Sequence, residues 1–164
     1  MRYEIGGARG TVEDHESILK TIRSWAESAG CDVLFADARA VFGRDHLETA
    51  VRHALRAHAA RTMAARSVSM EALRYLSGQR QVADAIRTAG IGSGTKGVAI
   101  AVFGDSRLDD LIALIGWSRD DAVLEPKGKS LRAIGISEAE SATLPSSARP
   151  DLALEKVALL DLEK

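Results

Sequence analysis

The run GVAIAVF at Gly97–Phe103 constrains the fold of this chain more than any other sequence feature. Seven successive residues carry no charge and include branched and aromatic side chains, which is the pattern of a buried β-strand. A buried strand must be covered by other elements. The rest of the chain is therefore expected to supply further strands and helices that pack against it.

Apolar patterns elsewhere predict such elements. We expect strands at Arg2–Ile5 and Asp32–Ala36, and a sheet-like run at Met70–Leu76 whose composition also allows a helix. Helices are expected at Glu13–Ser28, Arg44–Ala65, Gln79–Ala89 and Ser106–Ile115, with shorter ones near Lys129–Ile134 and Ser137–Leu144. Strands separated by helices predict the α/β (α+β) class. A single domain over residues 1–164 is expected, with a hinge at Thr143–Pro150 before a last helix at about 150–162.

Overall composition excludes several classes of protein. The chain has 22 basic and 23 acidic residues, a formal net charge of −1 that argues against a globally basic nucleic-acid binder. Aromatic residues make up 4%, too few for a platform of stacking rings. The single cysteine, Cys31, excludes an internal disulfide and favours a reducing, cytoplasmic setting. The N-terminus has no apolar run typical of a signal peptide, and we expect no membrane-spanning segment.

Two motifs of possible chemical interest have simpler interpretations. Gly92–Gly97 spells GSGTKG, but a predicted helix precedes it and a strand follows, the reverse of a dinucleotide-binding motif. His46 and His53 share a face of one predicted helix, two turns apart, without the further ligands that a metal needs. We therefore expect a plain turn at GSGTKG, and no catalytic residue, no cofactor and no metal.

Charge is distributed unevenly along the chain. Between Asp37 and Arg80 the sequence has eight arginines and four acids, a net charge of +4, which leaves −5 for the remainder. A guanidinium is a planar fork that matches phosphate. The segment is thus either a local RNA-binding patch or a solvated helix face.

Two segments suggest binding surfaces. The stretch SGQRQ at 77–81 contains a break at Ser77–Gly78, after which the backbone N–H groups of a new helix would form an anion site. The alternative is an ordinary N-cap by Ser77. The final segment, Pro150–Lys164, has apolar residues around most of a helix. It indicates either a contact with a protein partner or a fully internal helix.

Four stretches of the chain resemble a known family. GGARG, GRDHLETAVRHAL, SMEALRYLSGQRQVADAI and EKVALLDLEK occur here in the order found in the small accessory subunit of the KEOPS (EKC) complex, the TPRKB or p53-related protein kinase binding protein family. The resemblance covers nearly the whole chain, and its length suits the archaeal members. SGQRQ followed by an amphipathic helix is its most specific part.

The resemblance implies a small mixed β-sheet flanked by helices and a protein that is not an enzyme. It implies that the chain binds and activates the small kinase-like ATPase subunit of the complex. The complex makes threonylcarbamoyl-adenosine in tRNA, and archaeal members recruit tRNA through its 3′ CCA end. The alternative is a purely structural kinase-binding protein with no RNA role. In neither case is a small-molecule substrate expected.

The expected binding residues fall into two groups. For the tRNA site, the family motif places Ser77, Gly78, Gln79, Arg80 and Gln81. Charge and proximity in sequence add Arg66, His46 and Arg44. The apolar last helix places Leu154, Val157, Ala158 and Leu160 in contact with the kinase subunit.

Overall fold

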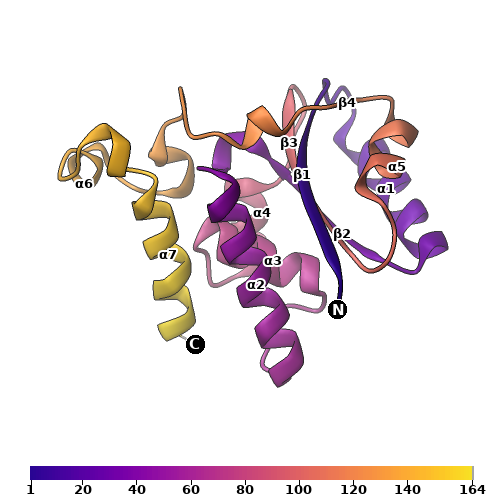
Figure 1. Ribbon diagram of the computed structural model, residues 1–164, viewed down its shortest axis with the longest axis horizontal. Helices are drawn as coiled ribbons and strands as arrows, with labels where there is room; N and C mark the ends of the chain where they lie inside the picture. Colours follow the sequence, from indigo (N-terminus) through magenta and orange to yellow (C-terminus); the bar gives the residue numbers. More distant parts are fainter. Residues whose placement is uncertain (164) are drawn as a thin grey trace.

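A four-stranded antiparallel sheet forms the centre of the computed structural model, which describes residues 1–163 (Figure 1). The strands are β1 (Tyr3–Arg9), β2 (Asp32–Asp37), β3 (Gly97–Phe103) and β4 (Ser118–Arg119), in the order β2-β3-β1-β4. Ile5 lies opposite Ala101, and Phe35 lies opposite Ile100. The expected mixed sheet is therefore antiparallel at each of its three strand pairs.

Strand β3 is buried on both of its faces, as its sequence predicts. Val98, Ile100 and Val102 pack into one apolar cluster, and Ala99, Ala101 and Phe103 pack into a second. The side chains alternate because successive residues of a strand point to opposite faces. Each face of the sheet consequently needs its own layer of helices.

Two groups of helices supply these layers (Figure 1). Helices α1 (His15–Ala29) and α5 (Leu108–Ile115) cover the face of Ile100. Helices α2 (Arg44–Ala60), α3 (Val68–Ser77) and α4 (Val82–Ala89) cover the opposite face. The three-layer arrangement confirms the α+β class.

The C-terminal quarter of the chain extends the layer of α2 and α3. Short helical turns occur at Ala38–Ala40 (η1), Asp121–Leu124 (η2), Leu131–Ile134 (η3), Glu138–Ser141 (α6) and Ser146–Ala148 (η4). The last helix, α7 (Asp151–Leu162), lies beside α2 and α3 (Figure 1). It begins where the sequence predicts, directly after Pro150.

The segment Met70–Leu76 is a helix rather than a strand. It belongs to α3, whose N-terminus is capped by the Ser67 side chain, which accepts a hydrogen bond from the backbone N–H of Met70. Asp32 of β2 accepts further hydrogen bonds from the backbone N–H and the hydroxyl of Ser69, at 2.8 and 2.7 Å. These bonds hold the start of α3 against the sheet, so tertiary contacts select the helical alternative.

Glycine in strand β1 permits a close crossing of the chain. A Cβ atom on Gly7 would lie 2.4 Å from Val123 Cγ2 and 2.7 Å from the carbonyl oxygen of Asp120. In the absence of that atom, the Gly7 N–H donates to Asp121 Oδ1 at 2.9 Å and the Gly7 carbonyl accepts from the Asp120 N–H at 3.0 Å. The Gly6–Gly7 pair therefore continues strand β1 to Arg9, beyond its predicted end at Ile5.

His46, in the first turn of α2, is fully buried against the end of α3. Its Nδ1 accepts a hydrogen bond from the Phe42 N–H at 3.1 Å, and its Nε2 lies 3.0 Å from the carbonyl oxygen of Leu76. A neutral ring protonated at Nε2 satisfies both contacts. Burial lowers the pKa of His46 to about 4, because the interior disfavours the charged ring.

This burial predicts an acid-sensitive fold. A group whose pKa is lowered on folding contributes its full stability above its unfolded pKa of 6.5 and loses it as the pH falls towards 4. We expect the difference in free energy of unfolding between wild type and His46→Asn to shrink by about 2 kcal/mol from pH 7 to pH 4.5. Urea denaturation at both pH values measures it. Identical pH dependence of the two proteins would contradict the prediction.

Candidate nucleic-acid and protein interfaces

The Ser77–Gly78 break ends helix α3 and does not begin the next helix. The Ser77 hydroxyl is buried and donates to the carbonyl oxygen of Leu73 at 2.8 Å. Gly78 adopts the left-handed conformation, with φ at 68°, that commonly closes a helix at its C-terminus. The expected helix start at Gln79, whether as an anion site or with Ser77 as its N-cap, is therefore wrong, because α4 begins only at Val82.

The remaining residues of the SGQRQ motif form a short loop. The Gln79 N–H donates to the Arg74 carbonyl oxygen at 3.0 Å, and the Arg80 carbonyl oxygen accepts from Arg74 Nε at 2.6 Å. The side chains of Arg80 and Gln81 are exposed, and Gln79 is partly exposed. The loop thus presents polar side chains on a backbone that is bonded to α3.

A buried ion pair joins this loop to the one before α3. Arg74 Nη1 donates to Glu71 Oε2 at 3.0 Å, and both side chains are buried. The same carboxylate oxygen accepts from the backbone N–H groups of Ala64 and Ala65, at 3.1 and 2.9 Å. The pair therefore brings Arg66, which follows Ala65 and is exposed, towards the SGQRQ loop.

The other expected RNA contacts lie elsewhere. Arg44 is exposed at the start of α2, 3.9 Å from a carboxylate oxygen of Asp121. Because α2 has 17 residues, its two ends are about 24 Å apart, which separates Arg44 from Arg66. His46 requires correction as an RNA contact, because it is buried and both ring nitrogens have backbone partners. The arginine-rich segment does not form one continuous patch.

Helix α7 is buried along one side and exposed along the other. Val157 and Leu160 are 0% and 2% exposed and belong to the core, so their expected role as kinase contacts requires correction. Of the other two expected contacts, Leu154 is partly buried and Ala158 is exposed. The large apolar side chains that α7 presents to solvent are Leu159 and Leu162, 45% and 82% exposed. Both leucines belong to the apolar pattern of the last segment, but the sequence alone did not indicate which face of α7 packs against the core.

Side-chain bonds fasten α7 to the rest of the fold. The Tyr75 hydroxyl of α3 donates to Asp161 Oδ1 at 2.8 Å, and Lys156 Nζ donates to the Ile134 carbonyl oxygen at 2.6 Å. The Lys156 stem also lies against Gly78, where a Cβ atom would be 3.0 Å from Lys156 Cδ. The SGQRQ loop and α7 therefore border each other.

These features define an α+β protein with two adjoining exposed surfaces, one basic and one apolar. Over residues 1–163, no group of three or more histidine, cysteine or carboxylate side chains could hold a metal ion. None of the described helices is both long and apolar enough to cross a membrane. The GSGTKG stretch is the expected turn between α4 and β3, with the Gly94 N–H bonded to the Val12 carbonyl oxygen.

The chain belongs to the family described as kinase binding protein CGI-121, whose model matches residues 11–127. The match covers most of the chain, from before α1 to just beyond η2. A comparison with curated proteins gave no match. Membership of a kinase-binding family is consistent with an accessory, non-catalytic role.

We expect two ion pairs with the same spacing in sequence, buried Glu71–Arg74 and exposed Asp84–Arg87, to contribute very differently to stability. Arg74→Met would leave Glu71 buried without its cation, so we expect the free energy of unfolding to fall by about 3–5 kcal/mol. Arg87→Met, which removes an exposed pair with Asp84, should cost less than about 1 kcal/mol. Chemical denaturation compares the variants, and equal losses would contradict the prediction.

Proposed function

We propose that this chain is the kinase-binding accessory subunit of a KEOPS-type complex in the cytoplasm, of the archaeal kind. It binds and activates the kinase-like ATPase subunit, and it recruits tRNA through the 3′ CCA end for threonylcarbamoyl-adenosine modification. Membership of the CGI-121 family is the observation that supports a kinase as the partner. The resemblance of the SGQRQ region supports the tRNA role, together with the exposed arginines beside it.

The exposed side of α7 is the proposed kinase contact. Leu159 and Leu162 project from consecutive turns of the helix, and the small side chain of Ala158 lies beside them. Exposed leucines on a helix whose other face is anchored in the core are suited to burial against a partner. Leu154 extends this surface towards the start of α7.

The proposed tRNA contact is the pair of loops that the Glu71–Arg74 bridge holds together. Arg66 and Arg80 supply exposed guanidinium groups, and the side chains of Gln79 and Gln81 supply amide donors and acceptors. An RNA end needs only a few phosphate contacts, so a chain with net charge −1 can still bind it. Guanidinium planes can also stack on unpaired bases, which compensates for the low aromatic content.

Substitution of the exposed leucines tests the kinase surface. We expect Leu159→Glu/Leu162→Glu to weaken kinase binding at least tenfold without unfolding the chain, because both side chains are exposed. Leu114→Glu is the control, since Leu114 is 53% exposed on α5 across the sheet. Co-purification and titration with the kinase subunit measure the effect. Unchanged binding by the double variant would remove α7 from the interface.

Salt dependence tests the RNA surface. Neutralising Arg66 and Arg80 together, as Arg66→Gln/Arg80→Gln, should lower the slope of log K against log salt by about 0.7 per lost phosphate contact. Lys20→Gln/Arg23→Gln removes the same charge from exposed positions on α1 and should leave the slope unchanged.

Transfer RNA with and without its CCA end completes this experiment. Loss of binding on removal of the CCA end supports recruitment through that end. Normal kinase binding with no measurable tRNA binding would instead establish the purely structural alternative.

A further inference from the structure

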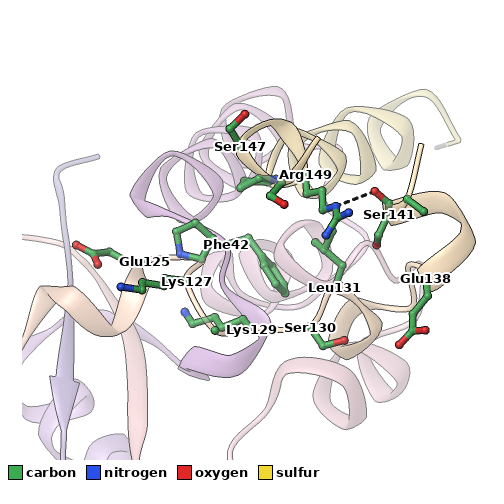
Figure 2. Close-up of a pocket in the computed structure, with 15 residues that line it drawn as sticks. Phe42, Glu125, Lys127, Lys129, Ser130, Leu131, Glu138, Ser141, Ser147 and Arg149 are labelled. Carbon is green, nitrogen blue, oxygen red and sulfur yellow. Dashed lines mark hydrogen bonds between the residues drawn. The ribbon is translucent and has the colours of Figure 1, made fainter. Parts of the chain in front are cut away.

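A cavity of about 760 Å³ lies between two loop segments of the C-terminal part of the chain (Figure 2). One wall is formed by residues 125–131, and the other by α6, η4 and the start of α7. All but four of its lining residues lie beyond residue 127, where the family match ends. The cavity is therefore largely a feature of this chain outside the matched segment.

The floor of the cavity is apolar. Phe42 is drawn near its centre, with Leu131 to one side (Figure 2). Pro126, Ala142 and Pro150 also line it. Rigid apolar walls of this kind accommodate a flat organic group, and the volume falls in the range of small-molecule sites.

Cations and hydroxyl groups occupy the rim and walls. Lys127, Lys129 and Arg149 line the cavity together with the hydroxyl groups of Ser130, Ser141, Ser146 and Ser147. Arg149 Nε donates to the carbonyl oxygens of Ser141 and Leu144, at 2.9 and 3.2 Å, which holds its guanidinium group against the wall. The two acids at the rim, Glu125 and Glu138, are exposed, and Glu138 lies 3.6 Å from Arg132.

Lys129 is placed where this cavity meets a second one. Its ammonium group donates to the carbonyl oxygens of Val41 and Val123, both at 2.6 Å, which leaves one N–H for a ligand. Burial lowers the pKa of Lys129 to about 8, so the group is still charged at pH 7. Because these hydrogen bonds already fix the Lys129 side chain, an anion that binds to it does not lose free energy in ordering that side chain.

The second cavity, of about 430 Å³, adds to the positive charge at this junction. It shares Glu125, Lys127 and Lys129 with the first cavity, and its other charged lining residues are the cations Arg9, Arg39 and Lys96 and one acid, Asp37. Arg9 and Arg39 are paired with Asp120 and Asp37. The exposed Lys96 and Lys127 have no ion pair within residues 1–163.

We propose that the larger cavity binds a phosphate monoester that carries a flat organic group, of the size of a nucleoside monophosphate. The phosphate lies at Lys127 and Lys129, where the two cavities meet. The flat group lies over Phe42, between the apolar walls and the guanidinium plane of Arg149. The serine hydroxyls contact the polar linker between phosphate and flat group. The ligand is bound and not converted, and the site is separate from Arg66 and Arg80.

Calorimetric titration of the full chain with AMP, adenosine and inorganic phosphate tests this assignment. We expect AMP to bind at least tenfold more tightly than adenosine or inorganic phosphate, because only AMP uses both parts of the site. Phosphate binding as tight as AMP binding would overturn the proposal, as would no heat with AMP.

Two variants and one competitor locate the site. Lys127→Glu, at an exposed position, should weaken AMP binding at least tenfold, and Ser147→Trp should do so by filling the cavity. Lys20→Glu on α1 is the matched charge control and should bind AMP normally. Unchanged AMP affinity in both cavity variants would overturn the proposal. Displacement of AMP by a CCA-ended oligonucleotide would also overturn the proposal, because it would assign the cavity to RNA. The Arg66→Gln/Arg80→Gln variant should bind AMP as tightly as the wild type.

Discussion

The burial of β3 on both faces is the constraint on which the rest of the structure depends. Because Ile100 and Ala101 point into different apolar clusters, neither face of the sheet can be left to solvent. The chain meets this requirement with α1 and α5 on one side and α2, α3 and α4 on the other. The proposed binding surfaces and the larger cavity all belong to the side of α2 and α3, which α7 and the C-terminal loops extend.

On that side, buried polar side chains organise exposed loops. Glu71 and Arg74 bond to backbone groups of Ala64, Ala65 and Arg80. The two ring nitrogens of His46 contact the backbone N–H of Phe42 and the carbonyl oxygen of Leu76. A buried carboxylate or guanidinium contributes little net stability compared with apolar packing, but it fixes the partners that it satisfies. Exposed side chains of these loops are therefore held on ordered backbone, which lowers the entropic cost of binding.

The sequence predicted those parts of the fold that local patterns determine. The run at Gly97–Phe103 and the start of the last helix after Pro150 were correct, because apolar composition and proline geometry act locally. Met70–Leu76 allowed both strand and helix, and long-range bonds to Asp32 decided between them. For the proposed site, the sequence predicted Arg66 and Arg80, which the structure leaves exposed, but it placed Leu160 and His46 on the surface although both are buried. Which face of a helix packs inward depends on the neighbouring helices, and the bridge of Glu71 and Arg74 to distant backbone has no local signal.

The charged crossing at Gly7 has a consequence for how this protein can associate. Asp120 and Asp121 occupy both backbone groups of Gly7, β4 occupies the following residues, and on the far edge Ala36 of β2 pairs with Gly90. Both margins of the sheet thus carry interruptions that disfavour the addition of a strand from another chain. These interruptions disfavour β-augmentation and edge-to-edge aggregation, and they agree with the proposal that partners bind to helix faces and loops.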